Sequence, residues 1–214
     1  MTIEKHLVTL GDSWPEGAEL GSGRRYGEII AEAHGRTLFN YGSGGASNED
    51  TLYQLQKYIK DHWRPGTDTV AIFFLTNPAR TAHFPRFMDT TKVTDPIFKE
   101  ALLWFHRAEH EVMRSSATVS AAQQWCQTLG IQDYYFAGWV RYNHWLPGVN
   151  TSKIYAQGQQ TAADWLGASN HNGEHLLDVG DNEYIKPNFC HPNQLGHNLI
   201  ADKLTSWINS TQSL

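Results

Sequence analysis

Residues 6–13 read HLVTLGDS, a short apolar run that ends in a Gly-Asp-Ser tripeptide. A continuous apolar run of this length, followed by a turn residue, is typical of a strand that is buried on both faces of a sheet. Two similar runs follow at residues 37–41 (TLFNY) and 69–75 (TVAIFFL), and small polar residues come directly after each of them. We therefore predict a sheet whose strands end in short polar turns.

Segments with helical spacing separate these strands. Residues 24–34 carry apolar side chains three or four positions apart, and a second helix is predicted from its N-cap, Asn48, to about residue 62. The other predicted elements are a helical stretch at 97–129, strands at 131–140 and 175–179, and a closing helix at 192–208. Strands that alternate with helices predict a mostly parallel five-stranded sheet with helices on both faces, which is a three-layer α/β/α sandwich.

The composition narrows the class of protein. The chain has 214 residues, of which 40% are hydrophobic, so we expect a single folded domain over residues 1–214. The net charge is −5 and no block of Lys or Arg stands out, which argues against a nucleic-acid partner. With only two cysteines, Cys126 and Cys190, the chain cannot build a disulfide framework or a four-cysteine zinc site.

The sequence gives no sign of a membrane segment or an export signal. The longest strongly apolar run, at residues 70–75, is far shorter than the roughly 20 residues that a membrane-spanning helix needs. Residues 1–10 carry charges and lead straight into the first predicted strand, which is unlike a signal peptide. We therefore expect no membrane span, and a cytoplasmic location by default.

Polar residues that follow the predicted strands are the candidate site. In an open parallel sheet, ligands bind outside the carboxyl ends of the strands. Three strands end in residues 11–13 (GDS), 40–46 (NYGSGGA) and 76–77 (TN), and His191 precedes the last predicted helix. We expect these four segments to meet in one crevice.

The four segments resemble the sequence blocks of the SGNH hydrolase superfamily, the GDSL-type esterases. Gly-Asp-Ser at 11–13 matches the family's first block, and residues 40–45 match its Asn-x-Gly-x-x-Gly block. The third block, usually Gly-x-Asn-Asp, keeps only Asn77, and the last block, Asp-x-x-His, appears with Asn188 in place of Asp before His191. The blocks occur in the family's order. They leave residues 79–130 and 141–172 uncovered, where we expect insertions.

The resemblance implies a flavodoxin-like strand order and a role for each matching residue. Ser13 would be the nucleophile and His191 its general base, since a serine hydroxyl needs an adjacent base at neutral pH. The oxyanion hole would be the backbone N–H groups of Ser13 and Gly45 and the side-chain amide of Asn77. Gly44 is an alternative to Gly45, because the register of a Gly-Gly pair is ambiguous.

The residue that orients His191 is left open. Asn188 stands where the family has Asp, and its amide oxygen can accept the imidazole N–H but carries no full negative charge. Another carboxylate, such as Asp178 or Asp181, could take this place. A third alternative is a catalytically weak or inactive protein that keeps the fold for binding.

A zinc hydrolase is a rival from another class. His106, Glu109 and His110 match H-x-x-E-H, a metalloprotease motif, but a third ligand is not evident and a packed or solvated pair is the plainer interpretation. The predicted function is therefore a serine hydrolase of carboxylic esters, with no cofactor and no metal. Its expected partner is a small-molecule or carbohydrate ester with a short acyl group, such as acetyl.

Overall fold

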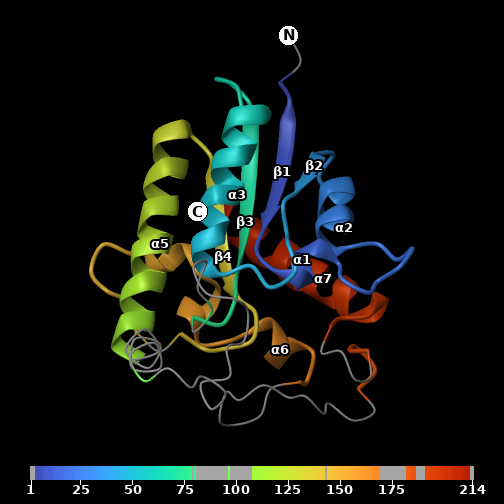
Figure 1. The fold of residues 1–214 in the computed structure, drawn as a ribbon. Coiled ribbons are helices and arrows are strands. Elements are labelled where there is room, and N and C mark those ends of the chain that lie inside the picture. Colours follow the sequence, from blue (N-terminus) through green and yellow to red (C-terminus); the bar gives the residue numbers. More distant parts are fainter. Residues whose placement is uncertain are drawn as a thin grey trace.

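The computed structural model describes residues 3–78, 80, 96, 108–142, 144–168, 182–186 and 191–212. Within them, four parallel strands form one sheet in the order β2-β1-β3-β4 (Figure 1). The strands are β1 (Lys5–Leu10), β2 (Thr37–Asn40), β3 (Asp68–Leu75) and β4 (Gln132–Ala137). The predicted α/β class with a parallel sheet is confirmed. The fifth strand, predicted at residues 175–179, lies outside the described residues.

Helices cover both faces of this sheet. They are α1 (Ser13–Glu16), α2 (Tyr26–Ala33), α3 (Asn48–Asp61), α5 (Ala108–Leu129), α6 (Ala162–Trp165) and α7 (Gln194–Gln212), with short 3₁₀ turns at Thr151–Lys153 and Tyr155–Gly158. Helices α3 and α5 pack together over one face, and α2 and α7 pack together over the other (Figure 1). The result is the three-layer sandwich expected from the alternation of strands and helices.

The β3 strand shows why its sequence is apolar throughout. Val70, Ile72 and Phe74 pack with the core beneath α2 and α7, whereas the residues between them pack with the core beneath α3 and α5. Successive side chains of a strand point to opposite faces of the sheet. A central strand with helices on both sides must therefore be apolar at every position, not at alternate ones.

The start of α3 differs from the prediction. Asn48 was expected to be the N-cap, but the N-cap is Ser47, whose hydroxyl accepts the Asp50 N–H while the Asp50 carboxylate accepts the Ser47 N–H. This reciprocal capping box satisfies two N–H groups at the start of the helix. It leaves the Asn48 side chain free to bind elsewhere.

The connections place the switch in strand order between β1 and β3. The chain passes from β1 outward to β2 and then returns across β1 to β3 and β4. A crevice forms at the carboxyl ends of strands where the order reverses in this way, and ligands of open α/β sheets bind there. Residues 11–13 and 76–77 follow the two strands that flank this point. Among the described residues, no helix combines the length and apolar character needed to cross a membrane.

Candidate active site

A glycine turn brings Ser13 to the end of β1. Gly11 has a φ of 138°, and a Cβ built on it would lie only 2.8 Å from the Phe74 Cβ, so a side chain at this position would be strained and would clash. The chain then reverses into α1, in which Ser13 is the first residue. Ser13 is buried, with 9% of its surface exposed.

The carboxylate of Asp12 is a buried structural anchor beside Ser13. Its Oδ1 accepts the Trp14 N–H at 3.1 Å. Its Oδ2 accepts hydrogen bonds from the Thr76 hydroxyl at 2.8 Å and from the Arg80 guanidinium at 2.7 Å. The Trp139 indole N–H also points to Oδ2, at 3.3 Å. Because Asp12 is fully buried, these contacts are needed to hold its charge, and they tie the end of β1 to the end of β3.

His191 lies against Ser13 although 178 residues separate them in the sequence. The His191 Nε2 is 2.9 Å from the Ser13 Oγ, which is a hydrogen-bond distance. The backbone on either side of His191 is fixed by a short pairing in which Ile185 is bridged to Pro192 and the Lys186 N–H donates to the His191 carbonyl at 2.9 Å. The imidazole is thereby presented just before α7 begins.

The other ring nitrogen of His191 has a different environment. Nδ1 is buried and has no hydrogen-bond partner in the part of the chain that the structure describes. The Oε2 of Glu19 lies 3.4 Å from it. The three residues that the sequence offered for this position, Asn188, Asp178 and Asp181, lie outside the described residues.

The loop after β2 lies beside Ser13. Asn40 fixes its start, because its Oδ1 accepts the Gly42 N–H at 3.0 Å and its Nδ2 donates to the Pro15 carbonyl at 2.7 Å. A Cβ built on Gly44 would lie 3.9 Å from the Ser13 Cβ, so the loop passes close to the Ser13 side chain. Gly45 has a φ of 71°, in the left-handed region that favours glycine. Both glycines proposed as oxyanion donors therefore belong to a loop that the structure places next to Ser13.

Asn77 follows β3 in the same region. The residue before it, Thr76, donates its N–H to the Asn48 Oδ1 at 2.9 Å, and the Asn48 Nδ2 donates to the Tyr142 hydroxyl at 2.7 Å. Asn77 itself is half-buried, and its carbonyl accepts the Arg80 N–H at 3.0 Å. The buried side chain of Asn48, which the sequence suggested only as a helix cap, thus holds the segment that carries Asn77.

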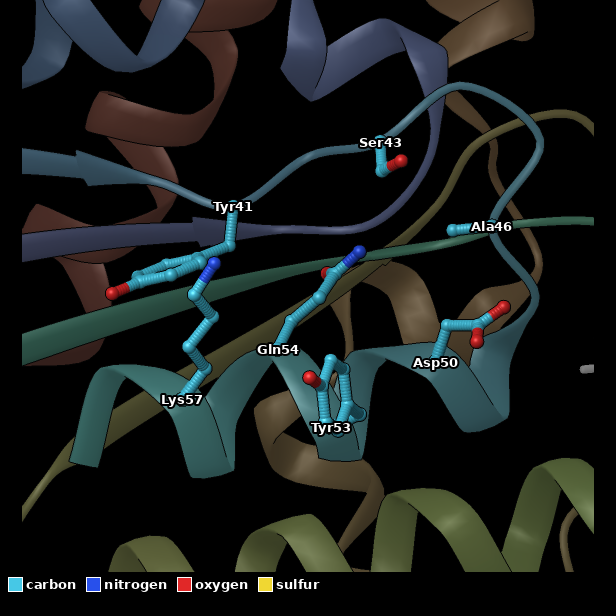
Figure 2. A pocket seen from close by; sticks show the side chains of 7 residues that line it. All are labelled: Tyr41, Ser43, Ala46, Asp50, Tyr53, Gln54 and Lys57. Carbon is cyan, nitrogen blue, oxygen red and sulfur yellow. The ribbon is translucent and has the colours of Figure 1, made fainter. Parts of the chain in front are cut away.

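A cavity of about 340 Å³ lies between the loop that follows β2 and helix α3. Its lining consists of Tyr41, Ser43, Ala46, Asp50, Tyr53, Gln54 and Lys57 (Figure 2). The Lys57 amino group lies 5.7 Å from the centre of the Tyr41 ring, and Tyr53 is 69% exposed. The lining is mixed in character, with two tyrosine rings and several hydrogen-bonding groups.

The rival zinc motif is only partly within the described residues. Glu109 and His110 lie in the first turn of α5, whereas His106 lies outside. Among the residues that the structure places, no three His, Cys, Asp or Glu side chains are grouped as a metal site would require.

His197 is a second histidine near the site, buried in α7. Burial, together with the positive charge of Arg25 and the nearby His191, lowers the pKa of His197 to about 4. Its Nδ1 accepts the N–H of Tyr26, the first residue of α2, at 3.3 Å. The ring is therefore neutral at pH 7 and caps α2, so it adds no charge beside His191.

Comparison with known proteins gives a match at the level of structure. Neither a family model nor a curated protein matches the sequence. The psychrotrophic esterase EstA from Pseudoalteromonas sp. is 14% identical and matches with a TM-score of 0.56, covering 98% of this chain and 99% of that chain. A protein from Desulfitobacterium hafniense, described as lipolytic and of the G-D-S-L family, is 12% identical and has a TM-score of 0.52, covering 95% and 98%. Identities this low establish the fold alone.

Proposed function

We propose that this chain, whose fold is that of the SGNH hydrolases, hydrolyses carboxylic esters through an acyl-enzyme on Ser13. The observation that carries the proposal is the 2.9 Å contact between the Ser13 Oγ and the His191 Nε2. The nucleophile and the base of a serine hydrolase lie within hydrogen-bond distance of each other, so this contact supports these roles for Ser13 and His191. The match in fold to esterases supports the same reaction class but does not identify the substrate.

The reaction would proceed in two halves. The Ser13 oxygen attacks the ester carbonyl while its proton passes to the His191 Nε2, and a tetrahedral oxyanion forms. When this intermediate collapses, the bond to the alcohol oxygen breaks and His191 returns the proton to the leaving alcohol. A water molecule then attacks the acyl carbonyl and loses a proton to His191. As the bond between the acyl carbon and the Ser13 Oγ breaks, His191 returns this proton to Ser13 and the carboxylic acid leaves.

The oxyanion would be stabilised by neutral donors. The Ser13 N–H is at the first position of α1, where no carbonyl of the same helix can accept it. The N–H of Gly45, or of Gly44, would come from the loop beside Ser13, and the amide of Asn77 from the segment after β3. Neutral donors suit this task, because they stabilise the new charge without forming an ion pair with a reacting group.

The substrate that we propose is an ester of a short acyl group, such as acetyl, with a carbohydrate hydroxyl. The cavity in Figure 2 supports this choice for the alcohol side, because an exposed tyrosine ring and nearby hydroxyl and amino groups suit a polar ring. The loop at residues 42–46 both lines this cavity and passes beside Ser13.

Tyr53→Ala should raise KM several-fold for acetylated xylan and leave KM for p-nitrophenyl acetate unchanged. Equal effects on both substrates would show that the cavity does not bind the alcohol part of the ester.

Hydrolysis of p-nitrophenyl acetate tests the reaction itself. Ser13→Ala and His191→Gln should each lower kcat by about 10³-fold or more, since loss of either partner disables the pair. Ser22→Ala, which alters an exposed serine in the loop after α1, is the matched control and should retain the wild-type rate. A Ser13→Ala protein that hydrolyses the ester at the wild-type rate would refute the proposal.

A further inference from the structure

The structure assigns a partner to the second nitrogen of His191. Among the described residues, Glu19 is the one carboxylate within 4.0 Å of the buried Nδ1, with its Oε2 at 3.4 Å. We propose that Glu19 orients His191 and stabilises the imidazolium that forms during the reaction. This inference rests on the proposed function, and it places the carboxylate near the nucleophile in the sequence rather than three residues before the histidine.

Glu19 reaches the imidazole because the chain folds back after α1. Gly17 ends the helix in the left-handed conformation, with a φ of 75°. The Ala18 N–H then donates to the Ser13 carbonyl at 3.0 Å, and the Leu20 N–H donates to the Gly17 carbonyl at 3.1 Å. One short segment therefore supplies both partners of the ring, Ser13 to Nε2 and Glu19 to Nδ1.

The backbone of Glu19 is held in an unusual conformation. Its φ is 65°, in the left-handed region that residues with a side chain rarely adopt. Such a conformation costs free energy and persists only where surrounding contacts impose it, which happens often at functional sites. The cost is understandable if the position is needed to aim the carboxylate at His191.

Lys186 links the two residues through the backbone. Its ammonium group donates a hydrogen bond to the carbonyl of Glu19. Its own N–H donates to the carbonyl of His191 at 2.9 Å. Because one residue fixes both main-chain segments, the distance between the Glu19 carboxylate and the imidazole is set by the fold as well as by their mutual attraction.

Other charges around the imidazole do not replace Glu19. Besides Glu19, charged or titratable side chains on or near the segments that carry Ser13 and His191 include Glu16, Arg25, Lys186 and His197. The buried Asp12 carboxylate is held by Thr76 and Arg80. Arg25 and Lys186 are positive, His197 is neutral at pH 7, and the Glu16 carboxylate lies against Gly44 instead. Among the described residues, Glu19 therefore carries the carboxylate that directly contacts the His191 ring.

The test is the pH dependence of p-nitrophenyl acetate hydrolysis by Glu19→Gln. Loss of the carboxylate should lower kcat about tenfold with little change in KM, a modest loss for an acid–base component because water screens this partly exposed pair. The acid limb of the kcat/KM profile should move to lower pH, because the negative charge that favours the protonated ring is gone. Glu19→Asp, which keeps the charge, should restore part of both effects.

The chain offers a matched control in another Glu–His pair. Glu4 lies 3.5 Å from the His6 Nε2 at the opposite end of β1, and Glu4→Gln removes the same charge there. It should change neither kcat nor the acid limb. The Glu19 side chain is 36% exposed, so thermal melting should show that Glu19→Gln folds normally.

The outcomes separate this inference from the proposed function. If Ser13→Ala is inactive but Glu19→Gln keeps the wild-type kcat and acid limb, the assignment of Glu19 is wrong and the hydrolase proposal stands. If Asn188→Ala instead lowers kcat and shifts the acid limb, the role belongs to Asn188. If Ser13→Ala keeps its activity, the hydrolase proposal fails whatever Glu19→Gln does.

Discussion

Gln54 binds both backbone polar groups of Gly11 with its single amide. The Gly11 N–H donates to the Gln54 Oε1 at 2.7 Å, and the Gln54 Nε2 donates to the Gly11 carbonyl at 2.9 Å. Gly11 sits between the end of β1 and Ser13, where the sheet no longer supplies all of its hydrogen bonds. Gln54 therefore continues the role of a neighbouring strand at the turn that carries the proposed nucleophile.

Gln54→Met should destabilise the protein because it removes this amide and keeps a similar volume. The buried Gly11 N–H would lose its acceptor, whereas the Gly11 carbonyl would keep the Ser43 N–H, so we expect the free energy of unfolding to fall by about 2 kcal/mol. Urea denaturation measures this change. Gln124→Met, at an exposed position on α5, is the control and should stay within about 0.5 kcal/mol of the wild type. Equal stability of the two variants would show that the Gln54 contacts contribute nothing.

Asn48→Ala should weaken catalysis, because Asn48 holds the segment that carries Asn77. The change leaves the buried Thr76 N–H without its acceptor and frees the segment that carries Asn77. Displacing one oxyanion donor costs about 10²-fold in kcat, so we expect a loss of that order in p-nitrophenyl acetate hydrolysis. Asn198→Ala, on an exposed part of α7, should have no effect. A wild-type kcat for Asn48→Ala would contradict the proposed role of Asn77 as an oxyanion donor.

His197 should make the protein less stable in mild acid. Its pKa is about 4 in the folded chain, below the value of about 6.5 expected when unfolded, so the unfolded chain binds the proton more tightly. The stability that comes from keeping this ring neutral is complete above about pH 6.5 and is lost as the pH falls toward 4, by up to about 3 kcal/mol.

His197→Gln isolates this effect, because it removes the titration and keeps a side-chain oxygen that can accept the Tyr26 N–H. Unfolding by urea between pH 7 and pH 4 should show a smaller loss of stability for the variant than for the wild type. The comparison cancels the contributions of the other acidic groups. Parallel curves for the two proteins would contradict a buried, neutral His197.

The sequence predicted the parts of the structure that depend on local patterns. The continuous apolar run identifies β3, because this strand is buried on both faces of the sheet. The helical spacing identifies α2, because this helix is buried on one face. Ser13, Asn77 and His191 were found because they follow strands or precede a helix at one edge of the sheet. Topology alone brings such positions together.

The supporting residues could not be predicted because their partners are remote in the sequence. Gln54 meets Gly11 across 43 positions, and the contact depends on how α3 lies over the sheet. Asn48 has the features of an N-cap, and only the packing of α3 shows that Ser47 takes that role. Glu19 gives no sequence signal at all, because its contact with His191 depends on a left-handed turn that glutamate rarely adopts.

Covalent labelling of the proposed nucleophile tests the central claim most directly. The folded protein should react with a fluorophosphonate ester at one site, and mass spectrometry of its peptides should place the phosphonyl group on Ser13. The reaction should be lost in Ser13→Ala, greatly slowed in His191→Gln and unchanged in Ser22→Ala. An unlabelled wild-type protein, or labelling that persists in Ser13→Ala, would contradict the account.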